Sequence, residues 1–153
     1  MANTYSQIHL QLIFAVKHRE ALIKNEWKDE IEKYICGIII HNRCKPLAIY
    51  CNPDHTHIFL GFRPGVLISD LVKTIKTSSN ALINERFCQS RNFGWQDGYG
   101  VFSYSYSQID AVVRYVMNQA EHHKKRMFRD EYIDMLRKSN IDFDDKYLFD
   151  FFD

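Results

Sequence analysis

The sequence predicts an α+β domain in which a ferredoxin-like antiparallel sheet has helices packed on one face and a further helical part follows. The apolar residues follow the order strand, helix, strand, strand, helix, strand, which is the split βαβ pattern of this class. The chain has 153 residues, enough for one domain with a single core. Because no internal repeat, low-complexity tract or long linker interrupts it, we expect residues 1–153 to form one domain.

The chain opens with an alternating segment and continues with a helical one. In residues 5–17 the apolar side chains occupy every second position while His9 and Gln11 point the other way, which predicts a strand with one buried face. Residues 20–42 are predicted to form a helix. Its apolar side chains recur at helical spacing: Trp27, Ile31, Tyr34, Ile35, Ile38 and Ile39.

A hairpin and a second helix are predicted next. Short strands at 45–51 and 55–62 are rich in apolar and β-branched residues, and the Asn-Pro-Asp turn at 52–54 joins them. Arg-Pro-Gly at 63–65 breaks the chain before a helix that we place at 69–87. Its apolar positions are Leu71, Ile75 and Leu82.

The last part of the chain predicts one strand and two helices. A glycine-rich aromatic loop leads into a strand at 101–106. Ser107, with Asp110 three residues later, resembles a capping box and so predicts the start of a helix over 108–122. A further helix is expected over 128–138.

The charge balance excludes a strong uniform field, because the formal net charge is only +1. Any contact with nucleic acid must therefore come from a local basic patch. The candidate DNA-binding residues are Lys73, Lys76, Arg86, Arg91, His122, His123, Lys124, Lys125 and Arg126. Each of them can equally be a solvated surface charge, and the helix dipole favours the cationic run at 122–126 without any function.

Cysteine usage and hydropathy point to a cytoplasmic protein. The four cysteines, Cys36, Cys44, Cys51 and Cys88, have no C-x-x-C spacing, and we expect them to be reduced, small apolar residues. No secretory signal precedes the first predicted strand. No apolar run approaches the roughly 20 residues of a membrane-spanning helix, so no membrane association is expected.

Two histidines stand two residues apart at the start of the third predicted strand. In a strand, side chains alternate between faces, so His55, His57 and Phe59 share one face. Histidine is the commonest metal ligand, and this spacing permits a metal-binding or catalytic pair. The alternative is a half-exposed strand end that carries two polar residues.

The predicted helix at 108–122 carries polar side chains beside its apolar stripe of Ile109, Val112, Val113, Val116 and Ala120. At helical spacing Tyr115, Gln119 and His122 lie together on the shoulder of that stripe. A tyrosine hydroxyl and an amide oxygen therefore stand one turn apart at the edge of a packed face. The alternative is an ordinary aromatic residue at the edge of the core.

These features together resemble the single-tyrosine HUH transposases of bacterial insertion sequences, over nearly the whole chain. The residues that carry the resemblance are HLQLIFAVKHRE, PDHTHIFL, WQDGYGVFSYSYS, VVRYVMNQAEHH and FRDEYIDML. One departure is Thr56, since the middle residue of the histidine pair is usually bulky and apolar in this family. Its side chain is expected on the opposite face from the histidines.

The resemblance implies a ferredoxin-like fold, a homodimer, and cleavage and joining of single-stranded DNA without ATP. Tyr115 would attack the scissile phosphate and form a covalent 5′-phosphotyrosine. His55, His57 and Gln119 would offer two imidazole nitrogens and an amide oxygen to Mg²⁺ or Mn²⁺. His9, on the polar face of the first strand, could lie near this site, and the alternative is a plain surface role.

The resemblance also implies the partners of the chain. Family members recognise DNA hairpins at the ends of the mobile element. Tyr115 and Gln119 of one chain would meet His55 and His57 of the other, although the sequence alone does not distinguish this from sites built within one chain. The alternatives to a transposase are a domesticated HUH nuclease and a ferredoxin-like nucleic-acid-binding module without catalysis.

Overall fold

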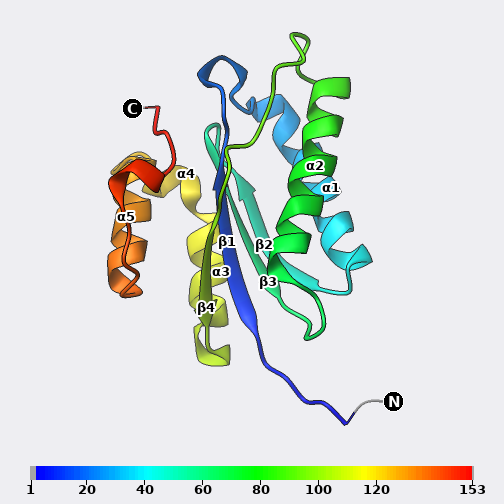
Figure 1. Ribbon diagram of the computed structural model, residues 1–153, viewed down its shortest axis with the longest axis vertical. Helices are drawn as coiled ribbons and strands as arrows, with labels where there is room; N and C mark the ends of the chain where they lie inside the picture. The colour runs from blue at the N-terminus through cyan, green and yellow to red at the C-terminus, as the bar shows by residue number, and fades with distance from the viewer. Residues whose placement is uncertain (1–2, 153) are drawn as a thin grey trace.

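A computed structural model describes residues 3–152 as one α+β unit, which confirms the predicted fold class (Figure 1). Its four strands are antiparallel in the order β2-β3-β1-β4. The strands are β1 (His9–Ala15), β2 (Lys45–Cys51), β3 (His55–Gly61) and β4 (Gly100–Tyr104). The helices are α1 (Asn25–His41), α2 (Ile68–Arg86), α3 (Ile109–Met117), α4 (Gln119–His122) and α5 (Phe128–Lys138). Short 3₁₀ turns lie at Arg19–Ala21, Tyr106–Gln108 and Asp145–Tyr147.

The two faces of the sheet are covered by different helices. Helices α1 and α2 lie over one face, and α3 lies over the other (Figure 1). The main core is formed with α1 and α2, whose fully buried residues include Ile31, Ile35 and Ile75. A smaller core joins α3 to the second face, where Val112 and Val116 pack on Ala48 and Phe59. The second face is therefore buried, and it is the face that carries His55 and His57.

The prediction of a first strand with only one buried face is wrong. Both faces of β1 are buried, and Gln11, expected to be exposed, has an exposed fraction of 1%. The physical reason is tertiary: β1 is a central strand, and α3 and α5 lie over the face that carries Gln11. The Gln11 side chain is satisfied there, because its Nε2 donates to Tyr104 Oη at 3.0 Å and its Oε1 lies 2.7 Å from His57 Nδ1.

The predicted helix over 108–122 is interrupted in the structure. Helix α3 ends at Met117, and Asn118 has a backbone conformation (φ −102°, ψ 25°) that separates it from the single turn of α4. The predicted capping pair Ser107 and Asp110 is also incorrect. Ser105 and Gln108 form the capping box instead, and Gln108 Oε1 accepts the Ser105 N–H at 2.9 Å.

The remaining predicted elements agree closely with the structure. The hairpin strands, the helix at 69–87 and the strand at 101–106 appear with ends shifted by one or two residues, and α5 spans the predicted 128–138. The helix predicted from residue 20 begins later, at Asn25. Within residues 3–152, none of the helices has the length and apolar character needed to cross a membrane.

Candidate active site

The hairpin between β2 and β3 places the two histidines on the covered second face of the sheet. Asn52 N–H donates to the His55 carbonyl at 2.8 Å, which closes the turn directly before the histidine pair. Strand alternation then points His55 and His57 to the same side, as expected. The exposed fractions are 1% for His55 and 0% for His57. The half-exposed alternative for this strand end is therefore wrong.

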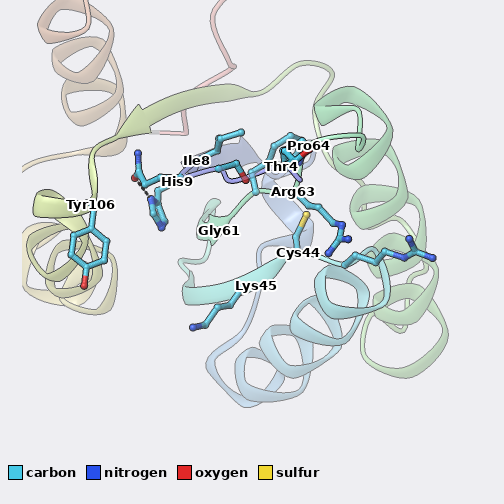
Figure 2. A pocket seen from close by; sticks show the side chains of 13 residues that line it. Thr4, Ile8, His9, Cys44, Lys45, Gly61, Arg63, Pro64 and Tyr106 are labelled. Carbon is cyan, nitrogen blue, oxygen red and sulfur yellow. Dashed lines mark hydrogen bonds between the residues drawn. The ribbon is translucent and has the colours of Figure 1, made fainter. Parts of the chain in front are cut away.

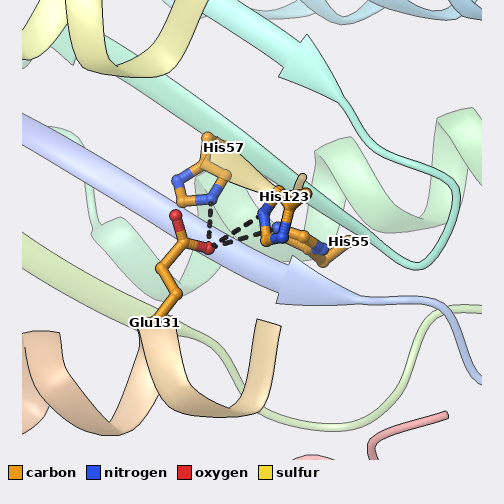
Figure 3. Close-up of side chains that lie close together, drawn as sticks. All are labelled: His55, His57, His123 and Glu131. Carbon is orange, nitrogen blue, oxygen red and sulfur yellow. Dashed lines mark hydrogen bonds and ion pairs between the residues drawn. The ribbon is translucent and has the colours of Figure 1, made fainter. Parts of the chain in front are cut away.

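A carboxylate from α5 completes a buried cluster around the histidines (Figure 3). Glu131 Oε1 lies 3.4 Å from His55 Nε2, 3.3 Å from His57 Nε2 and 3.3 Å from His123 Nε2. One ligand atom of each of the four residues lies within 4.8 Å of the others. Three imidazole nitrogens and a carboxylate oxygen are a donor set that suits a divalent cation such as Mn²⁺ or Zn²⁺.

The outer nitrogen of each histidine on β3 has its own partner. Asp54 Oδ1 lies 2.7 Å from His55 Nδ1, and Gln11 Oε1 lies 2.7 Å from His57 Nδ1. These oxygens accept a hydrogen bond from Nδ1–H, so in the neutral form of each ring the lone pair of Nε2 faces the cluster, whereas in the protonated form Nε2–H donates to Glu131. Asn52 Nδ2, 3.1 Å from His55 Nε2, is placed to donate to that lone pair. The residues thus fit a metal, because lone pairs converge where a cation would satisfy them.

Burial and charge set the protonation of the cluster. Burial alone would raise the pKa of Glu131, but hydrogen bonds with His123, His55 and His57 hold that pKa far below its ordinary value. Burial lowers the pKa of His57 to about 4. Burial also disfavours charged His55, but its hydrogen bonds with Asp54 and Glu131 outweigh this and raise its pKa. The cluster therefore holds an ionised carboxylate and a neutral His57 at pH 7.

Helix α3 brings Tyr115 to the same cluster. Its hydroxyl donates to Glu131 Oε2, and its ring lies 5.9 Å from the ring of His57 at 76°. His122 lies over the other side of the Tyr115 ring, at 4.6 Å between centroids and 30°. Burial, followed by the charge of Glu131, raises the pKa of Tyr115 well above its usual range. Tyr115 is thus a protonated hydroxyl in direct contact with the carboxylate of the cluster.

Gln119 lies beside the cluster, with an exposed fraction of 0%. Its Oε1 accepts from Asn52 Nδ2 at 3.2 Å and lies 3.0 Å from His123 Nε2. Its Nε2 donates to Glu131 Oε2 at 3.2 Å. The expected third ligand therefore contacts Glu131 and His123 of the cluster directly and reaches His55 through Asn52.

All of these contacts lie within one chain. The Tyr115 ring lies 5.9 Å from the His57 ring, and Asn52 Nδ2 donates to Gln119 Oε1 and lies 3.1 Å from His55 Nε2. Packing of Val112 and Val116 on Ala48 and Phe59 places α3 over β2 and β3. The sharing of sites between two chains stays a prediction.

Sequence reasoning missed Glu131 and assigned His123 to a different role. His123 was expected to belong to a basic DNA-binding run, but its ring faces Glu131 and His55. The signal for Glu131 was its position, because it lies among Phe128, Tyr132 and Leu136 on the apolar face of α5. A charged residue on the buried face of a helix requires a partner.

His9 does not belong to this site. It pairs with Gly61 and Tyr104 at the opposite end of β1, and its Nδ1 lies 2.5 Å from Gln7 Oε1. The residue of β1 that contacts the cluster is Gln11. Of the two roles left open for His9, a surface role agrees with this position, because strand alternation defines the face on which a side chain lies but not the neighbour at each register position.

Among the remaining basic candidates, Arg126 lies beside Tyr115, whose pKa its hydrogen bond lowers against the larger effect of burial, and the others lie apart from the cluster. Lys73 and Lys76 line a cavity of about 610 Å³ beside α2, where Lys76 Nζ donates to the carbonyls of Gln96 and Gly98. Arg86 forms an ion pair with Glu30 at 2.8 Å, and Arg91 lines a small cavity with it. Lys124 pairs with Glu121 at 3.0 Å, Arg126 with Asp134 at 3.4 Å, and Lys125 is exposed.

A cavity of about 780 Å³ lies at the other end of the sheet (Figure 2). Its walls come from the segment before β1, the turn after α1 and the segment after β3. Cationic and aromatic side chains line it, and its lining within the described residues includes no carboxylate: these side chains include His9, Arg43, Lys45, Arg63 and Tyr106. We call this cavity the basic groove. None of its cations was among the DNA-binding candidates.

Comparisons with known proteins show the family and the fold of the chain. The chain resembles the crystal structure of a proposed transposase from Deinococcus radiodurans, with 24% identity and a TM-score of 0.62 over 78% of this chain and 95% of that one. It also resembles a REP-associated tyrosine transposase bound to a REP hairpin, with 13% identity and a TM-score of 0.60 over 80% of this chain and 73% of that one. A search of curated proteins gave no match. These structural likenesses concern the fold, but the family described as IS200-like transposases matches residues 4–119, and the chain therefore belongs to that family.

Proposed function

We propose that the chain cuts and rejoins single-stranded DNA through a covalent link to Tyr115. The observation that carries the proposal is the contact of the Tyr115 hydroxyl with a buried cluster of three histidines and a carboxylate, in a chain of the transposase family. Nucleophile and phosphate-activating groups must meet in such a reaction, and here they converge from α3, β3 and α5. The direct test is covalent capture of labelled single-stranded hairpin DNA by the protein, followed on a denaturing gel.

The proposed reaction exchanges one phosphodiester for another. A bond forms between the Tyr115 oxygen and phosphorus while the bond from phosphorus to the 3′ oxygen breaks. The 5′ side of the break stays on Tyr115, and the proton that the phenol loses balances the one that the released 3′-OH gains. Attack of another 3′-OH on the phosphotyrosine reverses these steps and restores Tyr115, so joining needs no ATP.

The cluster fits a divalent metal, and we propose Mn²⁺ or Mg²⁺. His55 and His57 would hold it, with Glu131 as a third donor in the free protein and His123 and Gln119 beside it. Imidazole ligands favour Mn²⁺ over Mg²⁺. When bound, the cation would polarise a phosphoryl oxygen and orient the phosphate. Asp54 and Gln11 hold the two histidine rings in the tautomer that this role requires.

We propose that the substrate is a folded single strand whose hairpin lies on the basic groove. The support is the groove's charge together with the neighbour of similar fold that was solved with a REP hairpin. Arg43, Lys45 and Arg63 can contact phosphates, while Tyr106, 75% exposed, offers a ring on which a base can stack. The groove and the cluster lie at opposite ends of β1 and β3. A single DNA strand that runs along the sheet could therefore contact both.

Replacing Lys45 and Arg63 together by alanine is expected to weaken hairpin binding. Each phosphate contact that is lost should reduce the slope of log affinity against log salt by about 0.9, so the double variant should lose nearly two units of slope. Titration of labelled hairpin at several salt concentrations measures this change. The matched control replaces Arg19 and Lys33, two exposed cations away from the groove, and should leave the slope unchanged. If the two double variants had the same slope of log affinity against log salt, the hairpin would bind outside the basic groove.

A mixing experiment tests whether two chains share a site. Coexpression of a His57→Ala chain with a Tyr115→Phe chain yields a heterodimer if the protein dimerises. If each site is built within one chain, the two lesions damage both centres and the heterodimer is inert. Shared sites, which the family resemblance implies, leave one centre intact, so we expect the heterodimer to be active and DNA to become attached to the His57→Ala chain. A denaturing gel that separates a tagged chain from an untagged one distinguishes the two results.

A further inference from the structure

The inner groups of the candidate active site are closed to a DNA strand, while Tyr115 and His123 at its edge are partly exposed. The exposed fractions are 1% for His55 and Glu131 and 0% for His57 and Gln119. The proposed substrate is a phosphate in a polymer, which cannot pass through packed side chains to reach these groups. Some part of the protein that covers the cluster must therefore move before the proposed reaction starts.

The part that covers the cluster is the C-terminal segment 127–152, which consists of α5 and the tail after it and is called the cap below. Phe128, at its start, lies flat on the His55 ring at 3.7 Å between centroids and 4°. Glu131, one turn later, reaches into the cluster (Figure 3). The cap lies wholly beyond residues 4–119, which match the transposase family.

Glu131 makes the contacts that the proposed reaction requires of the scissile phosphate. One of its oxygens faces His55, His57 and His123, and the other accepts the hydroxyl of Tyr115. A carboxylate, like a phosphate, is an anion with acceptor oxygens, so it satisfies the same donors and the same cation. The nucleophile of the proposed reaction thus points at Glu131 in the closed protein.

The cap is attached mainly through side chains. Gln96 holds the tail from both sides, because its Nε2 donates to the Asp150 carbonyl at 2.8 Å and its Oε1 accepts the Asp150 N–H at 2.7 Å. Two aromatic pairs join the cap to the sheet, since Tyr132 packs on Phe102 at 6.5 Å and Phe128 on His55 at 3.7 Å between ring centroids. Such an attachment can open while the backbone hydrogen bonds of the sheet stay intact.

We propose that the cap closes the active site in the free protein, with Glu131 holding the place of the scissile phosphate, and that it moves aside when single-stranded DNA enters. This inference rests on the proposed function. A cavity of about 320 Å³ lies between the cap and the turn at 52–54, beside His123, and marks where the strand would enter. DNA and the cap then compete for the same position beside the cluster. The rate at which DNA becomes attached to Tyr115 therefore depends on the fraction of protein molecules whose cap has moved aside.

Gly100 on β4 provides a variant that loosens the cap without changing any residue of the cluster. A Cβ at this position would lie 2.7 Å from Tyr132 Oη and 2.8 Å from Tyr132 Cε1, so Gly100→Ala must displace the Tyr132 ring, which packs α5 against β4. Gly37→Ala is the matched control, because a Cβ there meets nothing within 4 Å. Glu131→Ala is the second variant, since it removes the side chain that occupies the phosphate position.

Access to the cluster can be measured without DNA or metal, by carbethoxylation of histidines followed by mass spectrometry. His41, which is exposed, serves as the internal reference. In the wild-type protein His55 and His57 should react at least about tenfold more slowly than His41, because they react only from the open state. Gly100→Ala should bring their rates up by about tenfold, whereas Gly37→Ala should leave them unchanged.

Attachment of hairpin DNA to Tyr115 is then compared under single-turnover conditions with Mn²⁺. Gly100→Ala and Glu131→Ala should both form the adduct faster than wild type, by up to about tenfold, and Gly37→Ala at the wild-type rate. Faster carbethoxylation in Gly100→Ala, with no adduct in any protein, would refute the proposed function and leave the cap supported. The cap is refuted if wild-type His55 and His57 react as fast as His41, or if Glu131→Ala loses an adduct that wild type forms.

Discussion

Tyr115→Phe is expected to abolish the covalent attachment of DNA, by a factor on the order of 10⁴ or more, as the loss of a nucleophile does in other enzymes with covalent intermediates. The change removes only the hydroxyl that contacts Glu131, while the ring keeps its contacts with His57 and His122. One hydrogen bond to a charged group is lost, so the free energy of unfolding should fall by no more than about 3 kcal/mol. Labelled hairpin DNA, Mn²⁺ and a denaturing gel measure the adduct.

The controls for this prediction are the other tyrosines near β4. Tyr104 Oη accepts from Gln11, Tyr106 lines the basic groove, and Tyr99 lines the cavity beside α2. None of these hydroxyls contacts the histidine cluster, so Tyr104→Phe, Tyr106→Phe and Tyr99→Phe should each keep the adduct. An adduct that persists in Tyr115→Phe would identify another nucleophile and would contradict the proposed function.

His57→Ala is expected to abolish cleavage while hairpin binding stays close to wild type. Its Nε2 would bind the cation that acts on the phosphate, whereas the groove proposed to bind the hairpin lies at the other end of the sheet. Removing the cation with a chelator should abolish cleavage by the wild-type protein in the same way. Adding Mn²⁺ should restore cleavage by the wild-type protein but not by His57→Ala. Cleavage and binding are measured on the same labelled hairpin.

The matched control for this prediction is His41→Ala, which replaces an exposed histidine at the end of α1. It should change neither cleavage nor binding. Because His57 is fully buried, its truncation also leaves a cavity, and thermal unfolding should show that the variant is folded at the assay temperature. If His57→Ala lost hairpin binding to the same extent as cleavage, a structural role for this histidine would be the better explanation.

The sequence alone predicted the features that depend on local pattern. The alternation of strands and helices predicted the fold class, and the ends of α5 were predicted to the residue. The two-residue spacing of His55 and His57 put both side chains on one face, because side chains of a strand alternate whatever surrounds it. Tyr115 and Gln119, one helical turn apart, were likewise expected to lie together, and both are at the cluster.

Only the tertiary structure decided which groups meet those residues. Glu131 is 74 residues from His57 in the chain, and its contact depends on how α5 packs across the sheet. The break at Asn118, the burial of both faces of β1 and the position of Tyr115 over its own strands also follow from packing that has no local pattern. Local spacing fixes the direction of a side chain, but its partner across the fold is set by long-range packing, and so the histidine pair was visible in the sequence while the carboxylate that faces it was not.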